Sequence, residues 1–202
     1  MRSRKLFLLS AIAFCSLLNI QFSKPYTAEW VITKGCSLKV DGKTNVNKFS
    51  CLIADYSEPE TLTFKKANAT GSIAMSGRLT LPVQNFDCHN PMMTKDLRKS
   101  LKAKEFPNLT IRFISLNKYP DFNRGQDTLD GLVSIELAGV TKRFTIHYTF
   151  IPEGDDSLTL IGTRKVYFSD FNIVPPRKLG GMIQTSNDLN VEFNLNIKVQ
   201  NH

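Results

Sequence analysis

The strictest pattern in this chain of 202 residues is an alternation of apolar and polar side chains near its C-terminal end. In "LNVEFNLNIKV", residues 189–199, every odd-numbered position is apolar and every even-numbered position is polar. Successive side chains of a β-strand point to opposite faces. The segment is therefore predicted to be a strand with an apolar inner face and a polar outer face.

The same alternation recurs in "RLTLPVQNF", "LTIRF", "LVSIEL" and "RFTIHYTF". The segments "LTLIG" and "VYFSDF" add one long or broken strand, in which Gly162 is expected to form a β-bulge. Weaker strand signals precede them in "EWVI", "CSLKV", "KFSCLIA" and "TLTFKK". Strands therefore dominate the expected fold.

Turn signals such as "SEPE", "PEGDD" and "VPPRKLGG" separate these strands. One-sided strands at this spacing are typical of an antiparallel barrel or sandwich. No domain boundary or strict repeat is visible after residue 23. The sequence thus predicts an all-β fold with a single domain over residues 24–202.

One segment interrupts the strands with a short, basic, amphipathic helix. Asn90 is a favourable N-cap, and Pro91 suits the first helical position. The apolar positions fall four residues apart on one face, which is expected to rest on the barrel; they are Met93, Leu97 and Leu101. We expect this helix, from Pro91 to about Lys102, to act as a lid.

The first 23 residues are predicted to be a secretory signal. "MRSRK" is a charged start, and "LFLLSAIAFCSLLNI" is an apolar run of 15 residues, shorter than the roughly 20 residues of a membrane-spanning helix. No clear cleavage site precedes "KPYTAEW", so an uncleaved anchor is the second interpretation. A lipoprotein signal is disfavoured because Phe14 precedes Cys15. A periplasmic or secreted location follows.

Charge argues against nucleic acid as a partner. The chain carries a net charge of +8, and removal of the signal leaves 23 basic and 18 acidic residues, a net of +5. The densest basic stretch, residues 98–104, is interpreted as a solvated face, and no nucleic-acid-binding motif accompanies it. An anionic lipid head group or a membrane surface stays open as a partner. The oligomeric state is not predicted.

The adjacent Cys88 and His89 are the first candidates for chemistry. A zinc site needs three or four ligands, and the chain adds only His147, His202 and the other cysteines, without ligand spacing. Adjacent residues at a strand end point in different directions, so Cys88 and His89 do not make a nucleophile and its base. We predict no enzyme, no metal site and no other cofactor.

Three cysteines remain after the predicted signal: Cys36, Cys51 and Cys88. Export favours a disulfide, and an odd count leaves one free thiol. Spacing alone leaves Cys51–Cys88 and Cys36–Cys51 as alternatives.

Four blocks in order resemble the YceI-like family of secreted, lipocalin-like barrels associated with polyisoprenoid binding. They are "EWVITKGCSLKVDGKTNVNKFSC", "DLRKSLKAKEFPNLTIRF", "LDGLVSIELAGVTKRFTIHY" and "VYFSDFNIVPPRKLGG". The resemblance covers nearly all of residues 29–200. The variants "GKTNVNKFSC" and "FDCHNPMMTKDL" resemble a branch common in Bacteroidetes-type bacteria, in which cysteines at these two places occur together. The resemblance therefore implies a Cys51–Cys88 disulfide, and it brings no fixed catalytic set.

The resemblance implies an elongated barrel around an apolar tunnel, and hence a binding or carrier protein for a long apolar lipid of the polyisoprenoid class. A solid-core surface or interaction module without enzymatic activity is the alternative, because apolar inner faces are also the default of a filled core. Polar contacts at the mouth are expected from loops, with Arg112 as a candidate whose facing the sequence does not fix. The inner-face residues expected to line the tunnel are Leu79, Leu81, Val83, Ile111, Phe113, Val133, Ile135, Phe144, Ile146, Tyr148, Val191, Phe193 and Leu195.

Overall fold

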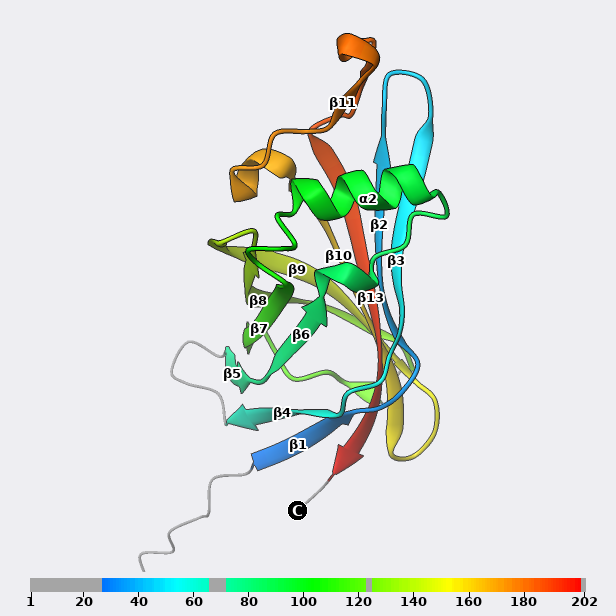
Figure 1. Ribbon diagram of the computed structural model, residues 1–202. Coiled ribbons are helices and arrows are strands. Elements are labelled where there is room, and N and C mark those ends of the chain that lie inside the picture. Colours follow the sequence, from blue (N-terminus) through cyan, green and yellow to red (C-terminus); the bar gives the residue numbers. More distant parts are fainter. Residues whose placement is uncertain (1–26, 66–71, 123–124, 201–202) are drawn as a thin grey trace, which may run out of the picture.

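The computed structural model describes residues 27–65, 72–122 and 125–200. The predicted signal peptide and His202 lie outside these ranges. Strands dominate the described chain (Figure 1). The strands are β1 Thr27–Ile32, β2 Cys36–Lys43, β3 Lys48–Tyr56, β4 Glu60–Lys65, β5 Ile73–Ser76, β6 Arg78–Pro82, β7 Asn108–Leu116, β8 Asp127–Leu137, β9 Val140–Pro152, β10 Ser157–Tyr167, β11 Arg177–Lys178, β12 Ile183–Gln184 and β13 Asp188–Gln200. The helical segments are η2 Val83–Asn85, α2 Pro91–Ser100, η4 Phe168–Phe171 and η5 Leu179–Gly181.

Eight strands close into an antiparallel barrel. Their order is β1, β4, β5, β7, β8, β9, β10 and β13, and β13 pairs back onto β1. Strand β6 adds to β7, and the β2–β3 hairpin adds to β13. The predicted all-β antiparallel barrel with a short helix is confirmed.

The long strand β13 divides the barrel into two ends. Its residues 197–200 pair with β1, whereas its residues 190–194 pair with β2. The wall is therefore completed by β1 and β4 at one end and by β2 and β3 at the other (Figure 1). We call these the lower end and the upper end, as they lie in Figure 1, and α2 lies across the upper end.

A covalent cross-link joins β3 to the segment that follows η2. The Leu52 N–H donates to the carbonyl of Asp87 at 2.7 Å, and the Asp87 N–H donates back at 2.9 Å. Beside this pair, Cys51 and Cys88 form a disulfide across 37 residues of sequence. The pairing implied by the family resemblance is confirmed, and Cys36 is free and buried.

The expected bulge at Gly162 is wrong, because β10 is one continuous strand. Gly162 pairs in register with Tyr148 on one side and Phe193 on the other. A Cβ at Gly162 would lie 2.2 Å from Cζ of Phe193. Glycine is needed here because the Phe193 ring takes the space of a side chain.

Helix α2 begins as predicted. The Asn90 side-chain oxygen accepts the N–H groups of Met92 and Met93, each at 3.0 Å, and Pro91 follows the cap. The helix ends at Ser100, two residues before the expected end. The hydroxyl of buried Thr94 accepts the N–H of Cys88 at 2.9 Å, which ties the first turn of the helix to the disulfide.

Aromatic side chains fill the lower end of the barrel. Trp30 is fully buried, and its ring centroid lies 4.4 Å from that of Phe64 and 5.7 Å from that of Phe150. Tyr119 and Phe122 complete the group at 6.0 and 6.4 Å from Trp30. We call these five residues the lower aromatic cluster. This end is a solid core.

Candidate functional site

The upper end holds a pocket between the barrel and α2. Its empty volume is about 850 Å³, which includes a part open to solvent. Six of the residues expected to line a tunnel do line this pocket: Ile111, Val133, Ile135, Ile146, Val191 and Phe193. The other seven lie in the buried core outside its lining: Leu79, Leu81, Val83, Phe113, Phe144, Tyr148 and Leu195.

Phe193 forms the floor of the pocket. Its ring lies against Gly162, and its centroid is 6.0 Å from that of Tyr148 and 6.4 Å from that of Phe113. Tyr148 in turn contacts Phe150 of the lower aromatic cluster, at 6.0 Å. Aromatic rings packed edge to face or tilted against one another therefore separate the pocket from the lower end. Burial raises the pKa of the Tyr148 phenol, so this side chain stays neutral.

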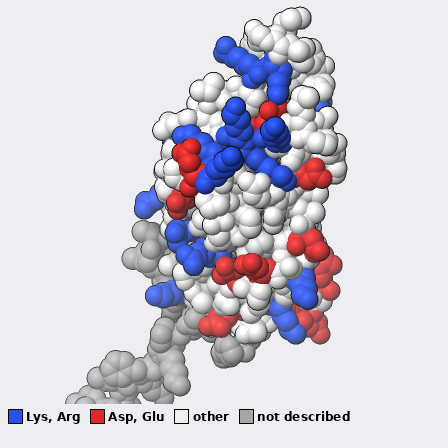
Figure 2. All heavy atoms as spheres, in the orientation of Figure 1, with Lys and Arg blue, Asp and Glu red and all other residues white. Residues whose placement is uncertain are grey.

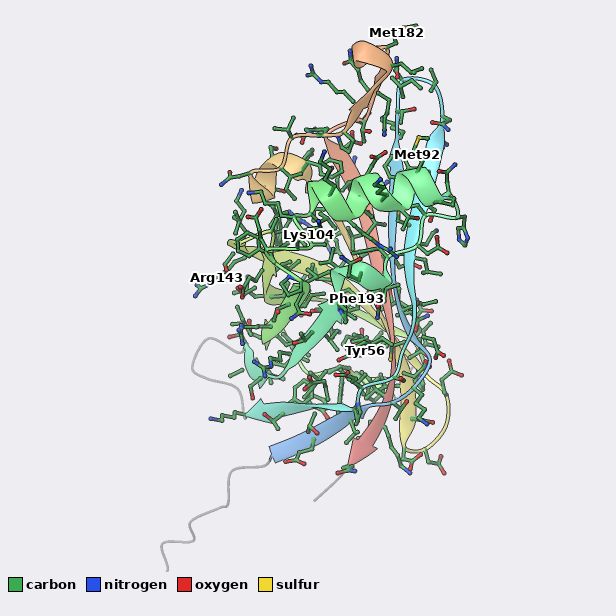
Figure 3. The ribbon with its side chains drawn as sticks, viewed as in Figure 1. Tyr56, Met92, Lys104, Arg143, Met182 and Phe193 are labelled. Carbon is green, nitrogen blue, oxygen red and sulfur yellow. A yellow bond between two sulfur atoms is a disulfide. The ribbon has the colours of Figure 1, made fainter. Side chains whose placement is uncertain are left out.

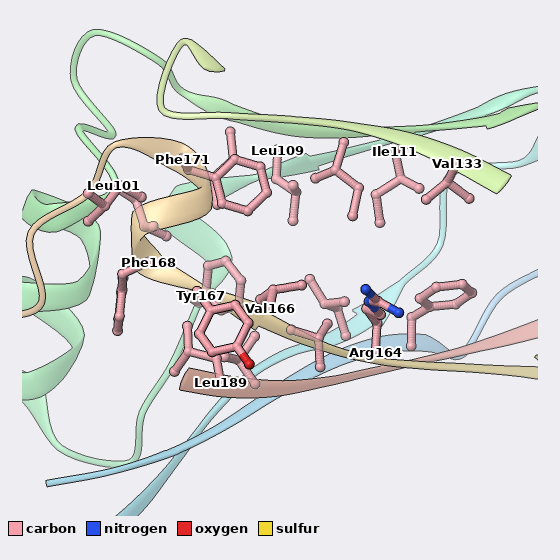
Figure 4. Close-up of a pocket in the computed structure, with 18 of the residues that line it drawn as sticks. Leu101, Leu109, Ile111, Val133, Arg164, Val166, Tyr167, Phe168, Phe171 and Leu189 are labelled. Carbon is pink, nitrogen blue, oxygen red and sulfur yellow. The ribbon is translucent and has the colours of Figure 1, made fainter. Parts of the chain in front are cut away.

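Two helical segments roof the pocket. Leu97 of α2 and Leu101, the residue that caps the end of the helix, are buried and line it, whereas Met93 is half-buried and lines a neighbouring groove. The second roof element is η4, whose Phe168 and Phe171 point into the pocket (Figure 4). Sequence reasoning missed η4 as part of the site; the signal was the aromatic spacing in "YFSDF".

Along part of the pocket wall, the neighbouring strands β9 and β10 are not paired with each other. Their ladder ends at the pair Thr163–His147, and beyond it β10 pairs only with β13. Arg164 and Tyr167, which follow on β10, are exposed and also line the pocket (Figure 4). We call this gap the β9–β10 seam, and it is a mouth of the pocket.

The expectation for Arg112 is wrong. Arg112 is exposed on β7 between the buried residues Ile111 and Phe113, so it lies on the outer face. The charged residue that does line the pocket is Arg164, which the sequence analysis did not single out. Every other residue of the lining is apolar, apart from the Tyr167 hydroxyl. The lining is thus apolar and offers few polar contacts to a ligand.

A second groove lies at the tip of the upper end, with an empty volume of about 950 Å³ that also includes open solvent. It runs between the β2–β3 hairpin, the start of α2 and the β11–β12 hairpin. The tip is held together by Asn45, whose side chain donates to the Met182 carbonyl at 2.8 Å and accepts the Gln184 N–H at 3.0 Å. Figure 3 shows Met182 and Met92 at this end.

The candidates for chemistry give no catalytic arrangement. Cys88 is in the disulfide, so it has no thiolate to act as a nucleophile. His147 is exposed on β9, and its Nδ1 is hydrogen-bonded to the Asp130 carboxylate. In residues 27–65, 72–122 and 125–200, no three His, Cys, Asp or Glu side chains meet as a metal site. No helix in the described part of the chain is long and apolar enough to cross a membrane.

A closed barrel with an apolar pocket beneath a helix defines a class of small-molecule binding folds, and the family within it is shown by sequence. The YceI-like domain model matches residues 24–197, so the chain belongs to the YceI-like family. No curated protein shows a significant similarity to the chain. The match to a Bacteroidetes-type branch stays a prediction.

Solved structures support the same fold. BcnA from Burkholderia cenocepacia is 16% identical, covers 80% of this chain and 95% of its own, and superposes with a TM-score of 0.58. A protein from Saccharophagus degradans, described as a polyisoprenoid binding domain implicated in plant cell wall breakdown, is 9% identical. It covers 85% of this chain and 98% of its own, also with a TM-score of 0.58. At these identities the likeness establishes the fold alone.

Proposed function

We propose that this protein is an exported, non-enzymatic carrier that holds a long apolar lipid of the polyisoprenoid class in the pocket beneath α2. The observation that carries the proposal is the pocket itself, with an empty volume of about 850 Å³ and a lining that is apolar except at Arg164 and the Tyr167 hydroxyl. Ligand sites of proteins are typically concave and lined mostly by apolar side chains, with a few polar groups that fix the orientation of the ligand. Burial of each CH₂ group contributes about 0.8 kcal/mol, so affinity can grow with chain length and without polar recognition.

Two further observations support this class of ligand and this location. The structural relative from S. degradans is described as a polyisoprenoid binding domain, and it shares the fold. The Cys51–Cys88 disulfide favours an oxidising compartment, in agreement with the predicted signal peptide. The lipid class and the periplasmic or secreted location belong to the proposal.

The tip of the upper end is the part of the carrier that meets an anionic bilayer. Six of the seven large apolar side chains that are exposed in the described ranges belong to the upper end: Val46, Met92, Tyr167, Val174, Leu179 and Met182. Figure 2 shows Lys and Arg gathered over the face that carries α2. Exposed lysines on and just after α2 include Lys95, Lys99 and Lys102. Apolar tips beside basic residues suit a negatively charged membrane surface.

The carrier role is tested by extracting and identifying by mass spectrometry whatever lipid co-purifies from the native host. The delipidated protein is then titrated with farnesol, which should displace Nile red from the pocket. Val133→Trp should weaken farnesol binding at least about tenfold, because the indole fills pocket volume. An absence of both co-purified lipid and farnesol binding would contradict the carrier role and favour the interaction module.

Membrane contact is tested by co-sedimentation with vesicles of phosphatidylglycerol and, for comparison, of phosphatidylcholine. Binding to the anionic vesicles should weaken in high salt and in Lys99→Gln. It should persist in Lys65→Gln, a matched loss of an exposed charge on β4 at the lower end. Equal binding to both vesicle types, or equal effects of the two substitutions, would rule out this docking surface.

A further inference from the structure

Arg164 occupies an inner-face position of β10. Its neighbours two residues away, Gly162 and Val166, are buried and line the pocket, and in register it faces Val191 of β13, which also lines it. Alternation along a strand places all of these on one face. Arg164 thus puts a permanent positive charge on a face that is otherwise apolar.

The seam explains how this charge is accommodated. The β9–β10 ladder ends at Thr163, one residue before Arg164, so the side chain lies at the mouth and not in the sealed part of the barrel. An arginine can lay its apolar stem along the wall while its guanidinium stays hydrated. Figure 4 shows the guanidinium among the apolar side chains of the lining.

In the described part of the chain, the Arg164 guanidinium makes no hydrogen bond or ion pair, so no carboxylate neutralises its charge. Asp41 and Glu192 share a hollow with it on the outer surface. The Asp41 carboxylate is held by Lys39 at 2.9 Å, and Glu192 projects from the outer face of β13, between inner-face Val191 and Phe193. The guanidinium is therefore free to take an anion that arrives from the pocket.

We propose that Arg164 binds the anionic head group, a phosphate ester or a carboxylate, of a lipid whose chain fills the pocket. The proposal rests on the carrier function and names the class of lipid that it carries. A guanidinium matches the geometry of both oxyanions with two parallel N–H donors, and such charge-assisted bonds are stronger than neutral ones. The head group would sit in the β9–β10 seam, with the remaining oxygens in water.

This placement also gives the ligand a direction. The chain would run from Arg164 over Phe193 and beneath Leu97 and Leu101, with the charged end at the seam. The apolar part supplies most of the affinity, and Arg164 selects between lipids of equal length. A neutral alcohol and an anionic ester with the same chain should therefore differ in affinity.

Calorimetric titration of the delipidated protein with dodecyl phosphate, dodecanoate, dodecanol and inorganic phosphate tests the proposal. Both anionic lipids should bind at least about tenfold more tightly than dodecanol, as expected for a charge-assisted pair. Inorganic phosphate alone should neither bind nor compete. Arg164→Gln should abolish the preference for the anionic lipids, whereas Arg164→Lys should retain part of it.

Arg112→Gln is the matched control, because it removes an arginine from the outer face of β7. It should keep the full preference for the anionic lipids. If Arg164→Gln also keeps the preference for the anionic lipids, Arg164 is only a hydrated side chain at the seam. The proposal is then wrong, while the carrier function stands. If wild type binds none of the three lipids, the carrier function fails as well. Competition by inorganic phosphate would mean a site for free anions in place of a lipid head group.

Discussion

The two ends of the barrel are built from the same kind of strand but have different interiors. At the lower end, β1 and β4 complete the ring, and the lower aromatic cluster fills it around Trp30. At the upper end, β2 and β3 take their place, the β9–β10 ladder is open, and α2 and η4 cover a pocket. An eight-stranded barrel is just wide enough either to be filled by side chains or to hold one small ligand. This chain combines a filled interior at one end with a pocket at the other.

For the carrier proposed above, this division between a filled end and a pocket end has a structural advantage. The solid end supplies a fixed core, because close-packed rings resist rearrangement. In that proposal the pocket end opens by movement of α2, which is tied to the barrel at its first turn by Thr94 and near its last turn by Arg98, whose guanidinium donates to the Phe86 carbonyl at 2.8 Å. Stability and ligand exchange would then reside in different parts of one sheet.

The largest effect should come from truncating an aromatic ring at the solid end. Phe150→Ala should lower the free energy of unfolding by about 3–5 kcal/mol, because Phe150 is fully buried between Trp30 and Tyr148. Phe168→Ala, an equal truncation in the roof, should cost less because that ring already borders empty space. Urea denaturation of both variants measures the difference. Equal losses would contradict the contrast between the two ends.

Removal of the disulfide should have the next largest effect. Replacing Cys51 and Cys88 together by Ala should lower stability by about 2–4 kcal/mol, because the cross-link restricts the unfolded chain. Cys36→Ala is the control, since Cys36 is free. Burial raises the pKa of the Cys36 thiol, so a thiol reagent should label it slowly in the folded protein. Thermal melts and labelling rates check both expectations.

A bulky residue should be accepted at the hollow end and rejected at the solid end. Val133→Trp and Val191→Trp place an indole in the pocket and should cost less than about 1 kcal/mol while abolishing most lipid binding. Leu62→Trp places it beside fully buried Trp30, where overpacking typically costs about 1–3 kcal/mol. Melting temperatures and Nile red binding are the measurements. Severe destabilisation by both pocket variants would mean a filled core.

Local patterns predicted the strands and the helix because their signals lie within a few residues. The alternation in β13 and the Asn90–Pro91 cap are signals of this kind. Which inner residues face empty space depends on register and closure, which no short segment encodes. Phe193 and Leu195 share one face of β13, yet only Phe193 lines the pocket.

Two other features were hidden for related reasons. Within the polar run "TRKVY", the sequence does not show that Arg164 lies on the inner face of its strand. An arginine is accommodated at this inner position because the ladder between β10 and β9 ends one residue before it. Gly162 suggested a bulge, but its role is to admit the ring of Phe193 from the neighbouring strand. Both features depend on contacts between strands that are distant in sequence.

The smallest effect on stability, but a clear effect on kinetics, should follow from loosening the roof. Leu97 is buried in α2 and lines the pocket, so Leu97→Ser removes an apolar contact between helix and barrel. The lipid keeps most of its contacts with the strands, and equilibrium affinity should fall by less than about threefold. The barrier to opening falls because the helix detaches more easily, so the release rate should rise by more than the affinity falls.

Stopped-flow displacement of Nile red by farnesol measures this release rate directly. Lys95→Ser is the matched control, because Lys95 is exposed on the same helix. It should leave both affinity and release rate unchanged. A release rate in Leu97→Ser equal to that of wild type would mean that the ligand leaves without movement of α2. Because Arg164 and Tyr167 line the mouth there, the β9–β10 seam would then be the exit.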